Sequence, residues 1–226
     1  MLEKDDIAYI RNTLQFWKDL NDAQQKTLLQ MTVKKQFKSG EPIHTDSDNC
    51  SGIFLLKSGQ VRGYIVSENG KEITLYRLFD RDVCIFTASC MMRNISFEIF
   101  IEAEKDTQAY LIPTPVYRKL TQESLAVQSY TNDLMASRFS EVMWIMEQAL
   151  FVSFDKRLAN FLMEQSNINE TDLLEITHEK IANHLGTARE VVTRMLKYFQ
   201  SEGMVELNRG AIAIIDKKKL DTLSAQ

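Results

Sequence analysis

The stretch THEKIANHLGTAREVVTRMLKYF, residues 177–199, decides the fold of the carboxy-terminal part of this chain. Apolar residues recur at helical spacing on both sides of Gly186, which can adopt the positive φ that a tight turn needs. These apolar residues are Ile181, Ala182, Leu185, Val192, Met195 and Phe199. The spacing predicts two short helices that cross at the glycine, as in a helix-turn-helix.

The second of these helices carries a polar face opposite its apolar stripe. We expect a capping box at its start, in which Thr187 accepts from a first-turn amide and Glu190 folds back onto the cap. Arginine can chelate guanine, a carboxylate can accept from cytosine, and lysine can hold phosphate. The predicted DNA-binding residues of this segment are Thr187, Arg189, Glu190, Thr193, Arg194 and Lys197.

A hairpin is predicted directly after this helix. Gly203 is placed to end the helix, and residues 205–215 alternate apolar side chains around Asn208-Arg209-Gly210, a turn signal between two strands. Arg209 would lie at the tip of this wing and contact DNA. The whole combination favours a winged helix-turn-helix over residues 153–226 above an ordinary helical hairpin with a solvated charged face. We expect it to open with a helix at 155–164 and a polar loop at 166–171.

The composition is that of a globular protein. The 226 residues are 44% hydrophobic and 26% charged, enough for one large or two small domains. No apolar run reaches the length of a membrane span, and the first residues, MLEKDDIAYI, are acidic, unlike a signal sequence. We therefore expect a cytoplasmic protein with no membrane partner. The net charge of −4 argues mildly against DNA binding, but the local charge of the binding face matters more.

The amino-terminal half changes from helical to strand-like patterning. Residues 5–33 carry apolar side chains at helical spacing, and short alternating runs broken by turn residues follow. The predicted strands are 53–56, 60–66, 72–78, 98–103 and 108–113. So many short strands predict a jelly roll or barrel over residues 1–120, and the chain as a whole is expected to be of the α+β class.

One long helix is predicted over residues 121–152, because no proline or glycine occurs between 123 and 152. Its apolar residues near heptad spacing include Met135, Val142, Ile145, Met146 and Ala149. They favour the seam of a homodimer, with a core helix as the alternative. A dimer would place two recognition helices about 34 Å apart on a palindromic operator.

Together, these features resemble the Crp/Fnr family of bacterial transcription regulators over nearly the whole chain. FKSGEPI at 37–43, SGQV at 58–61 and GKE at 70–72 look like the family's β-roll turns, and KRLA at 156–159 looks like the start of its DNA-binding domain. The resemblance implies a cyclic-nucleotide-binding-like sensor domain, a dimerisation helix and a winged helix-turn-helix. It also implies an activator or repressor of transcription, with RNA polymerase as a partner if the protein activates.

The resemblance extends to single positions of the DNA-binding segment. Arg189, Glu190 and Arg194 stand at the family's base-reading positions, and His178 stands where a contact to the DNA backbone or to polymerase is often made. Ala188 departs from the pattern, because it lacks the hydroxyl often found there.

The family's cassette for a cyclic nucleotide is missing. Phe97 and Glu98 occupy the place of its phosphate-binding arginine and serine, and a carboxylate there repels phosphate. Arg93 could serve only if the loop slips in register. On the long helix, apolar Val142 and Met143 stand at the purine-contacting place. We therefore expect an effector other than a cyclic nucleotide. A cyclic nucleotide stays the alternative.

An apolar pocket could receive a hydrophobic effector or haem, although core packing explains the same residues and is favoured. The residues assigned to this candidate pocket are Phe86, Cys90, Met91, Arg93, Phe97, Val142 and Met143, with Met92 beside them. No cofactor is predicted, and haem is the alternative.

The cysteines favour structural thiols. Cys50, Cys84 and Cys90 are odd in number and lack the close spacing of metal ligands, so no metal site is predicted. A redox pair of Cys84 with Cys90, or a metal held by Cys90 and His44, stays open. No cysteine precedes Cys50, which argues against the iron–sulfur cluster of one branch of the family.

Two other classes of function are weighed against the regulator. A sensory module that has lost DNA binding is supported only by the net acidity and by Ala188. An enzyme would need clustered metal ligands, a nucleophile beside a base, or a glycine-rich phosphate loop, and the sequence offers none of these patterns. We therefore predict no catalytic residues and no enzymatic activity.

Overall fold

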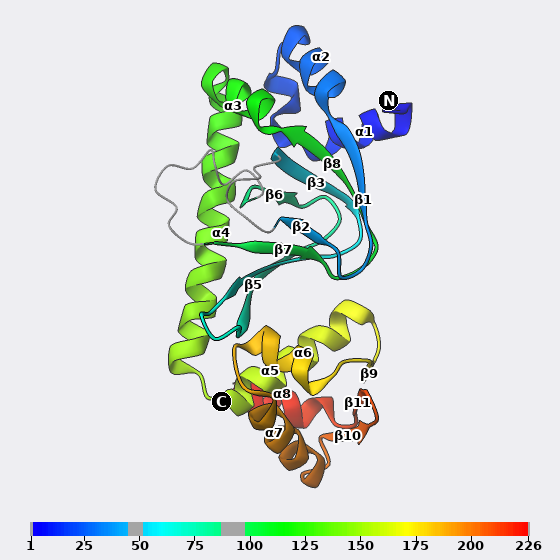
Figure 1. The fold of residues 1–226 in the computed structure, drawn as a ribbon, viewed down its shortest axis with the longest axis vertical. Helices are drawn as coiled ribbons and strands as arrows, with labels where there is room; N and C mark the ends of the chain where they lie inside the picture. Colours follow the sequence, from blue (N-terminus) through cyan, green and yellow to red (C-terminus); the bar gives the residue numbers. More distant parts are fainter. Residues whose placement is uncertain (1, 45–51, 87–97, 226) are drawn as a thin grey trace. The chain divides into compact units, whose positions relative to one another are not determined.

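The computed structural model describes residues 2–44, 52–86 and 98–225 (Figure 1). The chain divides into two compact units. The first comprises Met1–Ile65 and Leu75–Val142, and the second comprises Val66–Thr74 and Met143–Gln226. None of the helices in the described ranges combines the length and the apolar character that crossing a membrane requires.

Two four-stranded sheets form the β-roll of the first unit, in the orders β1-β8-β3-β6 and β2-β7-β4-β5. The strands are β1 (Val33–Phe37), β2 (Pro42–His44), β3 (Gly52–Ser58), β4 (Val61–Val66), β5 (Glu72–Leu78), β6 (Val83–Cys84), β7 (Phe100–Ala103) and β8 (Thr107–Pro113). The expected roll is confirmed, and all five predicted strands form. Three further strands, β1, β2 and β6, were not predicted, because they are short or mostly polar.

Helices cover one end of the roll (Figure 1). They are α1 (Lys4–Thr13), the 3-10 helix η1 (Gln15–Asp19), α2 (Asp22–Met31) and α3 (Thr114–Glu123). The central strand β3 is buried from Gly52 to Leu56 without a break. An unbroken apolar strand fits this position, since a strand covered on both faces needs apolar side chains on both.

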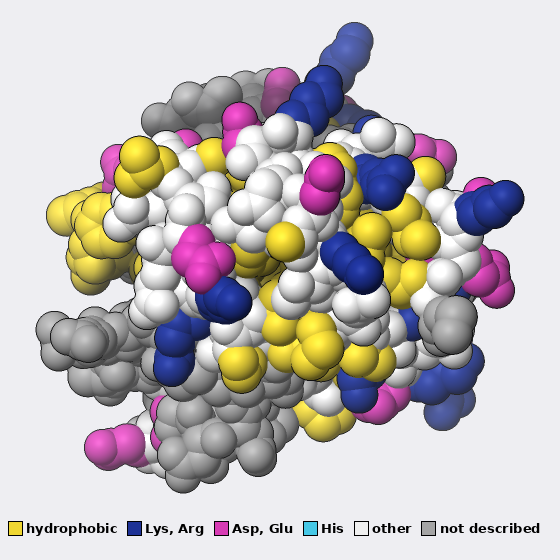
Figure 2. Space-filling view, turned by 90° about the horizontal axis from the view of Figure 1, so that it is seen from above, with side chains coloured by type: hydrophobic (Ala, Val, Ile, Leu, Met, Phe, Trp, Pro, Cys, Tyr) yellow, Lys and Arg dark blue, Asp and Glu magenta, His cyan; other side chains and the backbone are white. Residues whose placement is uncertain are grey.

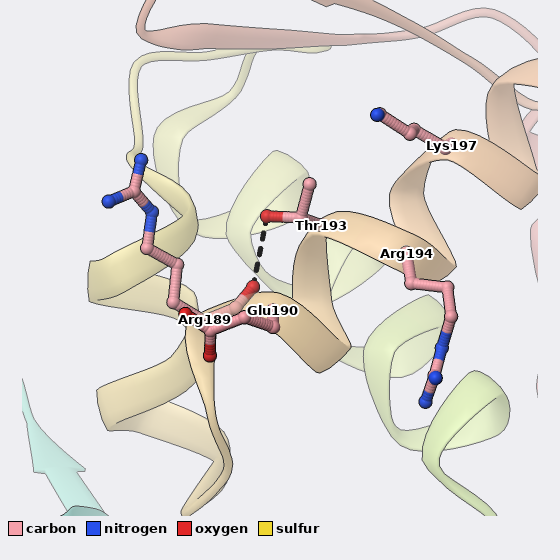
Figure 3. A pocket seen from close by; sticks show the side chains of 5 residues that line it. All are labelled: Arg189, Glu190, Thr193, Arg194 and Lys197. Carbon is pink, nitrogen blue, oxygen red and sulfur yellow. Dashed lines mark hydrogen bonds between the residues drawn. The ribbon is translucent and has the colours of Figure 1, made fainter.

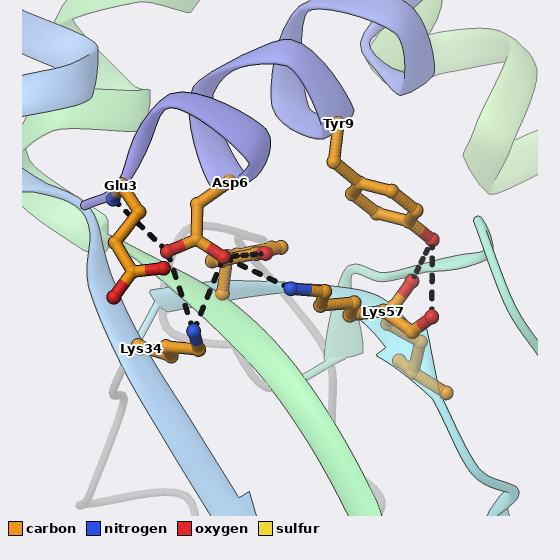
Figure 4. Close-up of polar contacts among 7 residues, drawn as sticks. Glu3, Asp6, Tyr9, Lys34 and Lys57 are labelled. Carbon is orange, nitrogen blue, oxygen red and sulfur yellow. Dashed lines mark hydrogen bonds and ion pairs between the residues drawn. The ribbon is translucent and has the colours of Figure 1, made fainter.

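A buried carboxylate holds α1 against the roll (Figure 4). Asp6 is 1% exposed and accepts hydrogen bonds from Tyr110 Oη at 2.6 Å, Lys57 Nζ at 3.0 Å and Lys34 Nζ at 3.2 Å. Nearby, the Tyr9 hydroxyl donates to the Leu56 carbonyl at 2.7 Å. These bonds connect α1 to β1, β3 and β8.

An aromatic stack fills the roll where it meets the long helix. The ring of Tyr76 stacks on Phe86 with centroids 5.7 Å apart, and the guanidinium of Arg138 lies 5.3 Å from the Tyr76 centroid. A Cβ built on Gly63 would lie 2.2 Å from Tyr76 Cζ, so only glycine fits beneath the ring. Burial, and then the neighbouring Cys84 thiol, raise the pKa of Tyr76 well above its ordinary value.

The long helix α4 (Leu125–Phe151) forms as expected, but its exposed apolar stripe differs from the predicted one. Phe139, Met143, Met146 and Leu150 are exposed at successive spacings of four, three and four residues, which is a heptad pattern. Of the predicted seam, Met146 belongs to this stripe and Ala149 is exposed beside it. Met135, Val142 and Ile145 are half-buried in the single chain, and their place in a dimer seam stays a prediction.

The second unit is a winged helix-turn-helix, as expected. Its elements are α5 (Phe154–Asn169), β9 (Leu173–Leu174), α6 (His178–Leu185), α7 (Arg189–Ser201), β10 (Val205–Asn208), β11 (Ala211–Ile214) and α8 (Lys217–Ala225). The wing is the antiparallel pair β10 and β11, and β9 extends it to a three-stranded sheet. A core that includes Leu162, Ile181, Val192, Leu196 and Phe199 joins the helices to this sheet.

The polar loop predicted at 166–171 is wrong, because α5 continues to Asn169. Ser166 is buried, and its hydroxyl donates to Asp172 Oδ1 at 2.6 Å, which satisfies the polar side chain inside the helix. The helix ends where Glu170 adopts a left-handed conformation with φ of 52°. Strand β9 and helix α8 were not predicted.

The surface carries mixed charge. In the view from above, Lys and Arg side chains lie singly among acidic and apolar ones, and they do not gather into one large basic patch on that face (Figure 2). This agrees with the net charge of −4.

Candidate nucleic-acid interface

The turn between α6 and α7 forms as the sequence predicts. Gly186 ends α6 in the left-handed region with φ of 64°, and Ala182 is buried where the helices meet. Thr177 caps the start of α6, since its side chain accepts from the Lys180 N–H at 3.2 Å. At the other end, Arg157 Nη1 donates to the Leu185 carbonyl at 3.2 Å. The α6 helix is thus fixed at both ends.

The predicted capping box at Thr187 is wrong. The α7 helix begins at Arg189, its N-cap is Ala188, and no side chain caps it. The reason lies in the preceding turn, where the Thr187 N–H donates to the Ala182 carbonyl at 3.0 Å. Thr187 therefore still belongs to the end of α6, and it is half-buried.

Five of the predicted DNA-binding residues line one hollow on α7: Arg189, Glu190, Thr193, Arg194 and Lys197 (Figure 3). The four charged side chains are exposed, and Thr193 is half-buried. In Figure 3 the guanidinium groups of Arg189 and Arg194 lie on opposite sides of Thr193. One short face thus offers donors, an acceptor and cations, which are the groups that base edges and phosphates require.

The remaining predicted residues lie outside this hollow. Arg209 is exposed at the wing tip, next to Gly210 with φ of 79°. His178 is the first residue of α6, and its Nδ1 lies 2.9 Å from Thr193 Oγ1. Partial burial, and then the charge of Arg189, lower the pKa of His178 below its ordinary value. Fifteen residues separate His178 from Thr193, so no local pattern pointed to this contact.

The predicted effector pocket is only partly described. Cys90, Met91, Arg93 and Phe97 lie outside the described residues, as do Cys50 and Met92. Phe86 is buried in the aromatic stack, Val142 is half-buried, and Met143 is exposed in the heptad stripe. Cys84 and His44 are buried. Within the described ranges, His, Cys, Asp and Glu side chains form no group of three or more that could hold a metal ion.

Two family models match the chain. The Crp-like helix-turn-helix domain matches residues 156–223, and the cyclic nucleotide-binding domain matches residues 34–124. A crystal structure from Eubacterium rectale, of a protein assigned to the Crp/Fnr family of transcriptional regulators, is 52% identical. It superposes with a TM-score of 0.93 over 95% of this chain and 100% of that one. This chain belongs to the Crp/Fnr family.

More distant members support the assignment. Electron transport regulator A of Shewanella oneidensis is 27% identical over 202 residues, which cover 84% of this chain and 78% of that protein. The Cyclic AMP receptor protein of Thermus thermophilus is 24% identical over 84% of this chain and 88% of that one. The chain is therefore a Crp/Fnr-type DNA-binding transcription regulator, one of a class of dimeric regulators. The predicted family, fold and function are confirmed, and the roles of single residues stay predictions.

Proposed function

We propose that α7 of each of two subunits reads one half of a palindromic operator. Arg189, Glu190 and Arg194 would contact base edges, and Lys197 would hold a phosphate. The single observation that carries this assignment is the exposed hollow on α7, which gathers these residues on one face. Thr187 at the turn and Arg209 at the wing tip would add contacts at its margins.

The exposed stripe of α4 supports a homodimer in which two copies of this helix pack together. Phe139, Met143, Met146 and Leu150 follow a heptad spacing, and large apolar side chains at such spacing are rarely left in water. Pairing would also strengthen the binding of a reader that has few cations. Each half-site contributes its own contacts, and the two contributions add in free energy.

A selection of duplexes from a randomised library tests DNA reading. The wild-type chain is expected to enrich a short palindrome, and Arg189→Ala or Arg194→Ala should each lose about 1–3 kcal/mol of binding free energy per half-site at fixed salt. Arg118→Ala is the matched control, because Arg118 is an exposed arginine on α3. Equal affinity of all four proteins for the enriched duplex would show that α7 does not read the bases.

The effector is proposed to be something other than a cyclic nucleotide. Arg138, the buried cation of α4, already contacts both carboxylate oxygens of Glu141 at 2.6 Å, so its charge is neutralised before any phosphate arrives. The Tyr76 ring lies beside it, with its centroid 5.3 Å from the guanidinium, and stacks on Phe86. Cyclic AMP is the second candidate, because the Thermus relative is named as its receptor.

Two measurements separate the effector classes. Titration with cyclic AMP or cyclic GMP is expected to leave the melting temperature of the protein unchanged, and a saturable rise would overturn the proposal. An absorbance spectrum and a native mass spectrum of anaerobically purified protein are expected to show a colourless dimer without added mass. A Soret band would identify haem instead.

The remaining parts of the proposal concern the setting. We infer that the protein works in the cytoplasm, where its DNA would be, and that it catalyses no reaction, as relatives of it are named as transcription regulators. RNA polymerase would be a partner if it activates. Transcription in vitro from a promoter that carries the enriched palindrome distinguishes activation from repression.

A further inference from the structure

A chain of hydrogen bonds joins the start of α6 to the first turn of α7. His178 Nδ1 lies 2.9 Å from Thr193 Oγ1, and Thr193 Oγ1 donates to the Arg189 carbonyl at 2.9 Å. Figure 3 shows the second of these bonds at the centre of the hollow. The three residues belong to the two helices whose crossing defines the reading face.

We assign the form of the imidazole ring by counting hydrogens, since the distance alone allows Nδ1 to donate or to accept. A threonine hydroxyl has one hydrogen, and here that hydrogen is used in the bond to the Arg189 carbonyl. The contact between Thr193 and His178 then needs its hydrogen from Nδ1. A neutral ring with a proton on Nδ1 has none on Nε2, so Nε2 is a bare acceptor.

The charges around His178 favour the neutral ring in the free protein. Arg189 on α7 is the charged group that faces it and lowers its pKa, after partial burial. On its own helix, the adjacent charged side chains are those of Glu179 and Lys180, and both are exposed. Glu175, in the segment before α6, is exposed as well.

DNA would reverse this balance. Thr193 lines the reading hollow, and the ring of His178 contacts Thr193. The phosphates that border a major groove carry only acceptor oxygens, so a bare Nε2 beside them is repelled, whereas a protonated Nε2 can donate.

We propose that His178 is a positioning residue of the reading face, which holds Thr193 and the first turn of α7 through Nδ1 and takes up a proton on Nε2 when DNA binds. The proposal rests on the proposed function of α7. Its consequence is that DNA affinity falls as pH rises through neutrality. Protonation of Nε2 leaves the bond from Nδ1–H to Thr193 intact, so His178 holds Thr193 in both protonation states.

The test uses the full-length dimer and the duplex enriched by the wild-type chain, at constant ionic strength. Between about pH 6 and pH 8, the wild-type dissociation constant is expected to rise by about three- to tenfold per protomer, as for one titrating histidine in each, and so by about ten- to hundredfold for the dimer. His178→Asn keeps an amide N–H near the position of Nδ1 but cannot titrate. Its affinity is expected to stay nearly constant over this range.

A pair of variants at Thr193 tests the bond between His178 and Thr193. Thr193→Val removes the hydroxyl and keeps the shape, whereas Thr193→Ser keeps the hydroxyl. The valine variant is expected to lose discrimination between the enriched duplex and a scrambled one, while the serine variant retains the His178 bond and the discrimination that depends on it. Equal discrimination by both variants would remove the positioning role.

Each failure has its own signature. If no duplex is enriched, the proposed function fails and this inference falls with it. If a duplex is enriched but His178→Asn keeps the wild-type pH slope, or folds and fails to bind at pH 8, the inference alone is wrong. Calorimetry of the wild-type protein in two buffers of different ionisation enthalpy counts the protons taken up, and a count of zero also overturns it.

Discussion

Replacing Asp6 by asparagine tests the buried polar contacts between α1 and the β-roll. Burial alone would raise the pKa of Asp6, but hydrogen bonds from Tyr110, the Glu3 N–H, Lys57 and Lys34 outweigh it and hold that pKa far below its ordinary value. Asparagine keeps the shape and removes the charge. Two cationic donors then face a neutral amide in a site where Asp6 was 1% exposed.

The expected loss can be worked from these contacts. Breaking a buried ion pair by removing one partner costs about 3–5 kcal/mol. We take the lower end, about 3 kcal/mol, because the side chains of Lys34 and Lys57 are 38% and 30% exposed and therefore partly screened. For a protein of this size, that loss lowers the melting temperature of the first unit by about 6–12 °C.

The pH dependence has a definite sign. Because the pKa of Asp6 is lowered on folding, its contribution is complete above the unfolded pKa and is lost as pH falls toward the folded pKa. The difference between wild type and Asp6→Asn should be constant from about pH 5 to pH 8 and shrink by about 1 kcal/mol near pH 3.

Urea unfolding at several pH values, followed by circular dichroism, measures this difference. Asp106→Asn is the control, since Asp106 pairs with Lys38 at 2.7 Å in an exposed position, and its unfolding midpoint should barely change. An Asp6→Asn protein as stable as wild type at pH 7, or a difference that does not shrink in acid, would refute the reasoning.

Three further predictions follow from single sites. Gly63→Ala should destabilise the first unit by about 2 kcal/mol in thermal melts, because the new methyl meets the Tyr76 ring; unchanged stability would contradict the stacking. Leu150→Glu should convert the dimer to a monomer in sedimentation, whereas Ser137→Glu, exposed on the opposite face of the same helix, should not. Lys197→Ala should weaken binding to all duplexes alike and reduce the salt slope by about 1 per protomer, and a sequence-dependent loss would instead assign Lys197 to a base.

The sequence predicted the DNA-binding unit well where its signals were local. Gly186 and Gly210 both adopt the positive φ that their turns need, and the two apolar stripes fall on buried faces. Leu196 was not predicted as a core residue although it is fully buried. The sequence predicted Met195 in the apolar stripe instead, and Met195 is only half-buried.

The failures came where tertiary contacts override local patterns. The spacing of Thr187 and Glu190 suits a capping box, but the turn after Gly186 draws the Thr187 N–H to the Ala182 carbonyl. The polar run after Glu164 looked like a loop, yet the bond from Ser166 to Asp172 lets the helix continue. Strand β1, with the sequence VKKQF, is mostly polar because β1 is an edge strand of its sheet.

In the candidate site, too, local features could be predicted and tertiary contacts could not. The charged residues of α7 could be predicted, since helical spacing alone places them on one face. The bond between His178 and Thr193 could not, because it depends on the crossing of two helices. Which apolar residues of α4 stay exposed also needed the structure, since several of them share the helical spacing and only their burial distinguishes them.

The central claim is that the exposed face of α7 reads bases, and the base preference of Arg194→Ala tests it most directly. The preference at every position would be measured by sequencing duplexes enriched by the wild-type and variant dimers at the same salt concentration. We expect the variant to keep the palindrome and its half-site spacing and to lose preference at one base pair in each half-site. An unchanged preference at every position would contradict the account.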